Sequence, residues 1–496
     1  MKITKSLLHV GVLGLSILAS NVMAAVSADE AAKLGTTLTP MGAEMAGNAA
    51  GTIPKWSPLP TNAGAVDARG FLANPYASEQ PQFTITAQNV EQYKDKLAPG
   101  QYAMFKRYSD TFKMPVYPTH RGATVPADVF AAIKKNATNT NLVSGGNGLE
   151  NFETAIPFPI PKSGVEVIWN HITRYRGGSV TRLVTQATPQ TNGSFSLVYF
   201  RDQFVFRDKM KDYDPKNPGN VLFYFKQQVT APARLAGGVL LVHETLDQVK
   251  EPRSAWVYNA GQRRVRRAPQ VSYDGPGTAA DGLRTSDNLD MYNGAPDRYD
   301  WKLEGKKEIY IASNSYKVDD PKLKYTDIIK AGHINQDLAR YELRRVWHVV
   351  ATLKEGQRHI YAKRDFFIDE DTWQAAVIDH YDGRGQLWRV AEAHAENYYD
   401  KQVPWYALET LYDLQSGRYL ALGMKNEEKQ AYDFGFTATT SDFTPAALRQ
   451  DGVRWAVATA TKNGSHPCGS WLASDSITSV SLTHRGACIA GKPAPT

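Results

Sequence analysis

The stretch Tyr341-Glu-Leu-Arg-Arg-Val-Trp-His-Val-Val-Ala-Thr-Leu353 carries the pattern that decides the fold. Successive side chains of a β-strand point to opposite faces, so residues two apart share a face. One face of this stretch reads Tyr, Leu, Arg, Trp, Val, Ala, Leu, and the other reads Glu, Arg, Val, His, Val, Thr and then Lys354. The pattern predicts a strand with one mostly apolar face against a core and one wet face.

Stretches of the same kind follow one another almost to the C-terminus, with no helical pattern between them. They cover residues 179–187, 194–207, 220–229, 239–247, 255–258, 263–268, 299–303, 307–312, 340–354, 359–367, 373–381, 386–396 and 406–412. Asn259-Ala-Gly-Gln262 and Asp382-Gly-Arg-Gly385 are typical of hairpin turns between neighbouring strands. The sequence therefore predicts a mostly β (α+β) protein built on a large antiparallel sheet. Its apolar face must be covered by helices, by curling of the sheet or by a ligand.

The residues before this sheet show helical periodicity broken by proline and glycine. Thr86 is a favourable N-cap for a helix over 87–97, which Pro99-Gly100 should end. Pro126 should open a helix over 127–136, and residues 165–176 place an apolar stripe on one side of another. The proline-rich residues 52–82 are expected to form a strap over another surface.

The N-terminus has the three regions of a cleavable export signal. Lys2 and Lys5 precede the apolar residues 7–18, and small residues stand at both positions before Ala25 that signal peptidase reads. We expect cleavage after Ala24, no lipid modification and a soluble periplasmic protein. The formal charge of +7 comes without a nucleic-acid-binding motif, so no nucleic-acid partner is predicted.

Four segments are expected along the 496 residues: 1–24 as signal peptide, 25–151 as helical and irregular strap segment, 152–454 as sheet domain and 455–496 as an atypical tail. The tail holds both cysteines, Cys468 and Cys488, which an oxidising compartment would allow to pair. Because the strand pattern ends before residue 455, deleting the tail should leave folding nearly unchanged.

No pattern of catalytic or metal-binding residues is complete. His243-Glu244 lacks the second histidine of a zinc protease, and Asp369-Glu370-Asp371 lacks the glycine and the twelfth-position glutamate of a calcium loop. His120 and His171 are expected to be structural. The sequence therefore predicts no enzyme, no cofactor and no metal.

Aromatic and basic residues on the predicted strands are the candidate ligand-binding residues. They are Phe200, Phe204, Trp256, Tyr258, Arg264, Arg266, Tyr341, Trp347 and Val349. Aromatic rings with a polar edge suit the lining of an amphiphile site, and guanidinium groups bind anionic headgroups. Two other interpretations stay open: the rings belong to an ordinary β core, and Arg263–Arg267 form a solvated edge strand.

Several strings carry a resemblance to a known family. They include residues 36–58, Lys113-Met-Pro-Val-Tyr-Pro-Thr-His-Arg121, Ile156-Pro-Phe-Pro-Ile-Pro161, Trp169-Asn-His171 and Ser441-Asp-Phe-Thr-Pro-Ala-Ala-Leu-Arg449. Together they resemble a proteobacterial exported family of unknown function, catalogued beside outer-membrane lipoprotein-sorting (LolA/LolB-like) proteins.

This resemblance implies an incomplete β-barrel of LolA/LolB type, covered by N-terminal helices. It also implies a periplasmic carrier or chaperone for a lipid, a lipoprotein acyl chain or another hydrophobic ligand. Inner-membrane transporters, outer-membrane barrels and the membrane surface are the partners that such a role suggests. The alternatives are a non-enzymatic scaffold of an envelope transport complex and, third, a periplasmic hydrolase.

Overall fold

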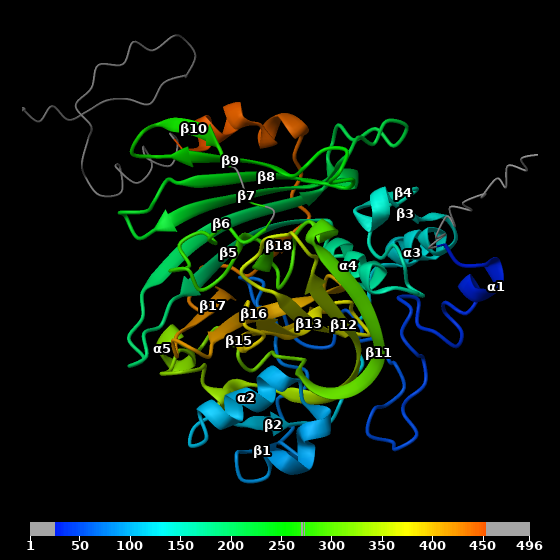
Figure 1. The fold of residues 1–496 in the computed structure, drawn as a ribbon, viewed down its shortest axis with the longest axis vertical. Helices are drawn as coiled ribbons and strands as arrows, with labels where there is room; N and C mark the ends of the chain where they lie inside the picture. Colours follow the sequence, from blue (N-terminus) through cyan, green and yellow to red (C-terminus); the bar gives the residue numbers. More distant parts are fainter. Residues whose placement is uncertain (1–24, 269–270, 272, 453–496) are drawn as a thin grey trace, which may run out of the picture.

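A computed structural model describes residues 25–268, 271 and 273–452 (Figure 1). The expected signal peptide and the expected tail with Cys468 and Cys488 lie outside these residues. Within them, no helix has the length and apolar character needed to cross a membrane.

The centre of the molecule is a 16-stranded sheet with the order β1-β2-β12-β13-β14-β15-β16-β17-β5-β6-β7-β8-β9-β10, to which β11 adds beside β12 and β18 beside β5. The strands are β1 (Phe83–Ile85), β2 (Met114–Val116), β3 (Asn141–Val143), β4 (Gly148–Glu150), β5 (Ser179–Ala187), β6 (Leu197–Phe206), β7 (Val221–Ala231), β8 (Val239–Thr245), β9 (Ser254–Asn259), β10 (Arg264–Arg267), β11 (Tyr299–Ala312), β12 (Tyr341–Leu353), β13 (Lys363–Asp369), β14 (Ala375–Tyr381), β15 (Leu387–Tyr398), β16 (Val403–Asp413), β17 (Tyr419–Met424) and β18 (Asp433–Phe434).

The predicted mostly β fold with a large antiparallel sheet is confirmed. Neighbouring strands are antiparallel except at a single parallel pairing between β2 and β12. The sheet curls, with β6–β10 above β12–β16 in the view of Figure 1. Within the described residues its end strands β1 and β10 do not pair, so it is not closed into a barrel. The two strands predicted over 299–312 are one strand, β11, with an irregularity between Leu303 and Gly305.

The order of the strands forces one long connection across the molecule. From β5 the chain runs outward, strand by strand, to the edge strand β10, then continues at β11 and returns inward to β17, which pairs with β5. Residues 273–298 therefore lead from one region of the sheet to a distant one. This crossing segment contributes Ala280, Leu283, Met291 and Tyr292 to the largest buried cluster.

The helices are α1 (Ala28–Ala31), α2 (Pro99–Arg107), α3 (Ala127–Asn139), α4 (Gly164–Thr173) and α5 (Tyr325–Ile328), with short 3₁₀ turns between them. The helices predicted near 127 and 165 are confirmed as α3 and α4. The helix predicted over 87–97 is wrong, because the structure has a 3₁₀ helix, Val90–Lys96, that begins after Asn89. Pro99 does not end a helix but begins α2, where its missing N–H costs nothing.

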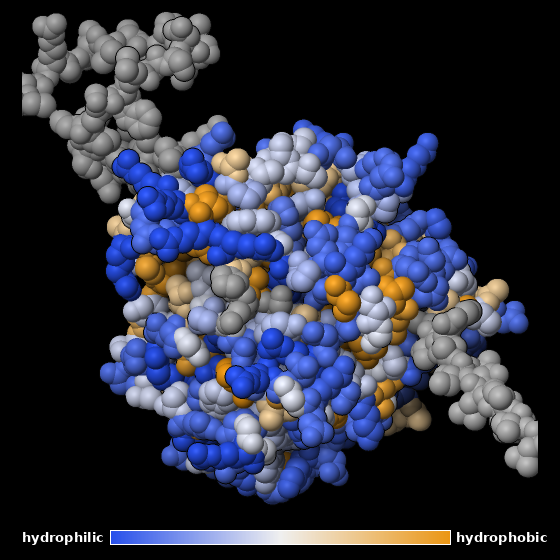
Figure 2. All heavy atoms as spheres, turned by 45° about the horizontal axis from the view of Figure 1, so that its top comes forward, coloured by the Kyte–Doolittle hydropathy of each residue, from blue (hydrophilic) through white to orange (hydrophobic). Residues whose placement is uncertain are grey.

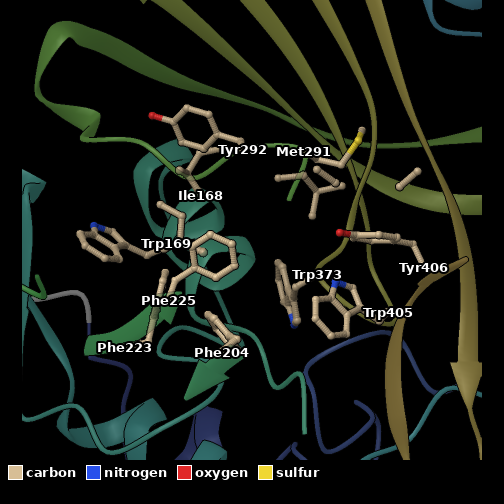
Figure 3. Packing of buried hydrophobic residues seen from close by; sticks show 14 of the residues in the cluster. Ile168, Trp169, Phe204, Phe223, Phe225, Met291, Tyr292, Trp373, Trp405 and Tyr406 are labelled. Atoms are coloured by element: carbon tan, nitrogen blue, oxygen red, sulfur yellow. The ribbon is translucent and has the colours of Figure 1, made fainter. Parts of the chain in front are cut away.

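The sheet is buried on both faces over much of its extent. On the inner face, α4 and the crossing segment pack against Phe204, Phe223 and Phe225 (Figure 3). The opposite face of β11–β17 is covered by α2, residues 53–116 and residues 318–339. Every residue of β16 is buried. The expectation of one wet face is therefore wrong for this region, since the N-terminal segment and residues 318–339 cover the face that alternation assigned to solvent.

His348 illustrates the difference. Its ring stacks on Phe367 with centroids 4.6 Å apart, while Trp347 on the other face stacks on Trp373 at 6.1 Å. We expect Trp347→Asp and His348→Asp each to lower the free energy of unfolding, by about 1–3 kcal/mol, because each removes an aromatic contact and places a carboxylate among packed rings. Urea unfolding measures both. Unchanged stability of the His348 variant would show that its face is solvated after all.

Candidate functional site

An apolar cavity of about 270 Å³ lies between strands β7–β9 and the crossing segment. Its apolar lining includes Phe223, Phe225, Leu240, Val242, Val257 and Leu289. Six polar side chains also line it: Gln227, Arg253, Thr278, Arg284, Ser286 and Asn293. A concave, mostly apolar site with a few polar groups is the usual form of a small-molecule site.

The strand period places these residues together. Phe223, Phe225 and Gln227 alternate along β7, and Leu240 and Val242 alternate along β8, so they share the inner face. The opposite face of the same strands is covered by residues 438–448, which include Phe443 and Leu448. The inner face is thus left to the crossing segment and the cavity.

Buried ion pairs hold the crossing segment down. Asp287 lies 3.0 Å from Arg364 and 2.8 Å from His359, and Asp290 lies 2.9 Å from Arg174 and also contacts Arg176. Burial alone would raise the pKa of the Asp290 carboxyl, but the two guanidinium groups outweigh it and hold the pKa well below its usual range. Because these pairs are buried, removing one partner costs more free energy than breaking a surface pair would.

The backbone at this anchor adopts an uncommon conformation. Asp290 and Met291 have φ angles of 51° and 65°, in the left-handed region that residues other than glycine seldom occupy. His171 also binds the backbone at Asp290. Its Nε2 donates to the Asp290 carbonyl at 2.9 Å, while its Nδ1 accepts from the Ala375 N–H at 3.0 Å. Burial lowers the pKa of His171 to about 3, so the ring is neutral and structural, as the sequence suggested. In the same way His120 is held by contact with Glu79 and by stacking on Tyr76.

The structure does not bring the nine predicted ligand-binding residues together, and none is among the described residues that line the cavity. Phe200, Phe204, Val349 and Trp347 pack in the inner core, whereas Tyr341 packs in the core on the opposite face. Trp256 and Tyr258 lie under residues 438–448. Their role in ligand binding stays a prediction.

The two predicted arginines of β10 lie closer to the cavity. Arg266 pairs across the strands with Val257, which lines the cavity and is 39% exposed. Directly paired residues project from the same face of a sheet, so Arg266, and Arg264 two residues before it, project from the cavity face. Both side chains are exposed on a short edge strand. Figure 2 shows hydrophilic side chains dominating this end of the molecule, with apolar atoms visible between them.

Two other hollows are larger and more polar. One of about 620 Å³ lies along the strap and includes Asp67, Glu79 and Arg340. Another, of about 750 Å³, includes Lys135 and Glu153, which pair with each other. In the part of the chain that the structure describes, no group of three or more His, Cys, Asp or Glu side chains is placed to hold a metal ion.

A family model described as "Protein of unknown function (DUF1329)" matches residues 84–449. The chain belongs to the DUF1329 family. An uncharacterized protein of Pseudomonas aeruginosa is 81% identical over 455 residues, which cover 92% of this chain and all of that protein.

Solved structures also show similarity, at low sequence identity. A DUF1329 family protein from Desulfovibrio piger is 14% identical, with a TM-score of 0.38 over 55% of this chain and 91% of that one. A structure from Vibrio parahaemolyticus, described as a "putative outer membrane lipoprotein-sorting protein domain", is 13% identical, with the same TM-score over 55% of this chain and 92% of that one. A LolA superfamily protein from Nitrosomonas europaea is 15% identical, with a TM-score of 0.34 over 57% and 98%.

The residues of this DUF1329 member that sequence reasoning missed are those of the crossing segment, above all Arg284, Asp287 and Asp290. The hydrophobic residues around them repeat neither every two residues, as in a strand, nor every 3.6 residues, as in a helix, so the search for strands and helices does not find them. One signal was present: about thirty residues without a predicted element separate the strands at 263–268 and 299–303. Loops of more than roughly 12–15 residues inside a compact domain are commonly functional.

Proposed function

We propose that this protein is a periplasmic carrier that binds a hydrophobic ligand in the cavity beneath the crossing segment, without catalysing a reaction. The observation that carries the proposal is the apolar lining of that cavity, supplied by β7, β8 and β9, in a molecule whose inner face is otherwise filled by its own core. The export signal read from Lys2, Lys5 and residues 7–18 supports the location.

Burial supplies the binding energy in this proposal. Each methylene group that leaves water gains about 0.8 kcal/mol, so even part of an acyl chain gives a useful affinity. The cavity volume of about 270 Å³ lies just below the usual range of roughly 300–1,000 Å³ for small-molecule sites. It therefore suits one chain and not a two-chain lipid. The rest of a longer ligand would extend past Val257 toward β10.

A scaffold without a ligand is the second candidate, and a specific observation favours it. The inner face of β11–β16 is filled by α4 and the crossing segment, with Trp169 and Trp373 fully buried there (Figure 3). Such a filled face leaves no room for a ligand over that half of the sheet. The two candidates therefore differ at β7–β9, where the cavity lies.

Dye binding and a substitution of Val257 distinguish the carrier from the scaffold. We expect the purified protein to bind the uncharged dye N-phenylnaphthylamine, and Val257→Asp to weaken binding at least tenfold, because a carboxylate in the apolar wall opposes an apolar occupant. Fluorescence titration measures the affinity. Val249→Asp is the matched control, since Val249 is also exposed, at 61%, but does not line the cavity. Absence of dye binding to the unmodified protein, with no lipid found by native mass spectrometry, would favour the scaffold.

A further inference from the structure

The two arginines in the cavity wall differ in their partners. Arg253 is neutralised by Glu244 at 2.6 Å and donates to two carbonyl oxygens, those of Val271 and Asn293. Arg284 is 6% exposed, yet among the described residues no carboxylate oxygen lies within 4.0 Å of its guanidinium group, and its Nε has no hydrogen-bond partner. An unpaired buried charge is costly, so this arrangement needs an explanation.

Asp202 and Glu409 act on the charge of Arg284 from a distance, but among the described residues neither forms an ion pair with it. Asp202 is already bound to Arg182 at 3.1 Å. Glu409 shares with Arg284 the wall of a small hollow of about 10 Å³, but neither of its oxygens has a hydrogen-bond partner within the described part of the chain. Burial, reinforced by the charge of Asp290, raises the pKa of Glu409, although the charges of Arg182 and Arg284 oppose the shift. A raised pKa favours the protonated, uncharged form of this carboxyl.

The backbone of the crossing segment fixes the position of Arg284. A Cβ on Gly277 would lie 2.6 Å from Cγ and 2.7 Å from Nε of Arg284, so the Arg284 side chain lies directly against Gly277 and a larger residue there would displace it. The Gly277 N–H donates to the Arg284 carbonyl at 3.1 Å, and Pro276 pairs with Thr285. Gly277 and Arg284 both line the cavity. The Arg284 side chain is thus packed against Gly277 in the cavity wall.

We propose that the ligand is a single acyl chain ending in a carboxylate, and that the carboxylate enters first and binds Arg284. This inference rests on the proposed function and adds to it the chemical class and the orientation of the ligand. A guanidinium group binds a carboxylate through two parallel N–H···O bonds, and such a pair is stronger in a desolvated site. The apolar walls of β7, β8 and β9 then surround the chain.

The opposite orientation would place the anionic group at the rim, near Arg264 and Arg266. Those side chains are exposed and hydrated. Ion pairs between exposed groups contribute about 0–1 kcal/mol, whereas an anion at Arg284 relieves a buried unpaired charge. The buried site therefore favours the carboxylate more strongly.

Displacement of the dye by three probes of equal chain length tests the inference. The probes are dodecanoate, dodecanol and dodecyltrimethylammonium, and the variants are Arg284→Met and Arg266→Met. We expect the unmodified protein to bind dodecanoate at least tenfold more tightly than dodecanol, and dodecyltrimethylammonium most weakly. Arg284→Met should lose this preference while still binding dodecanol, and Arg266→Met should keep it. Because an apolar residue replaces an unpaired buried charge, Arg284→Met should fold with a melting temperature at least equal to that of the unmodified protein.

The outcomes distinguish this inference from the proposed function. Equal affinity for dodecanoate and dodecanol in the unmodified protein overturns the inference and leaves the carrier intact. Loss of the preference in Arg266→Met, with Arg284→Met unaffected, places the carboxylate at the rim and likewise overturns it. Failure of the dye and of every chain to bind overturns the proposed function itself.

Discussion

Asp290→Asn should lower the free energy of unfolding by about 3–5 kcal/mol, the range expected when one partner of a buried ion pair is removed. The carboxylate of Asp290 forms ion pairs with Arg174, at 2.9 Å, and with Arg176. It also accepts a hydrogen bond from the indole N–H of Trp405 at 3.0 Å. Without it, two buried guanidinium groups lose their counter-charge. Because Asp290 anchors the crossing segment, we also expect the variant to bind the apolar dye more weakly. Urea unfolding and dye titration measure the two effects.

Asp281→Asn is the matched control. Asp281 lies on the same crossing segment, pairs with Arg418 at 3.0 Å and, like Asp290, has a positive φ, of 50°. Asparagine tolerates that backbone conformation, so the substitutions differ in burial of the pair and not in strain. The Asp281 side chain is 53% exposed, and an exposed pair contributes about 0–1 kcal/mol. Similar losses at both positions would show that the ion pairs do not anchor the segment.

The part of the fold that followed from sequence is the part that strand periodicity governs. Alternation and the two hairpin turns placed β5–β10 and β12–β16 close to their observed bounds, because side-chain direction along a strand is a local property. The strand β17 was not predicted, because its sequence Tyr419-Leu-Ala-Leu-Gly-Met424 has apolar residues on both faces and shows no alternation. It is buried on both faces because the outer face is covered as well, in part by residues 318–339, where the Tyr419 hydroxyl donates to the Lys330 carbonyl.

Much less of the candidate site than of the fold could be predicted from the sequence. Whether an apolar face meets a ligand, a helix or another segment depends on residues far apart in the chain, and alternation does not contain that information. Val257 illustrates this, because it stands between two aromatic residues that were predicted to bind ligand and yet it alone of the three faces the cavity. Arg284 belongs to an aperiodic segment, and its significance comes from the partner that it lacks.

Asp379→Asn should make the protein more stable at neutral pH and should flatten the dependence of its stability on pH. Asp379 on β14 is fully buried, and its Oδ2 accepts the Gly100 N–H at 2.9 Å while Oδ1 has no partner among the described residues. Burial raises the pKa of this carboxyl to about 8, although the Gly100 N–H opposes the shift. The unfolded chain releases the proton near pH 3.8, whereas the folded protein keeps it until about pH 8.

Between these two pKa values the folded state binds one more proton than the unfolded state, so stability falls as pH rises, by about 1.4 kcal/mol per pH unit for this group, and stops falling above pH 8. Asparagine accepts the same N–H bond without titrating, and the advantage of Asp379→Asn should therefore grow from pH 5 to pH 8. Urea unfolding across that range measures it. Asp382→Asn, in the turn three residues later, should leave the slope of the unmodified protein nearly unchanged. The backbone N–H of Gln386 lowers the pKa of Asp382, so this carboxylate is ionised in both the folded and the unfolded state from pH 5 to pH 8. An advantage of Asp379→Asn that stays constant with pH would mean that Asp379 is ionised in the folded protein, with α2 supplying enough polar contact at Gly100 to hold a buried carboxylate.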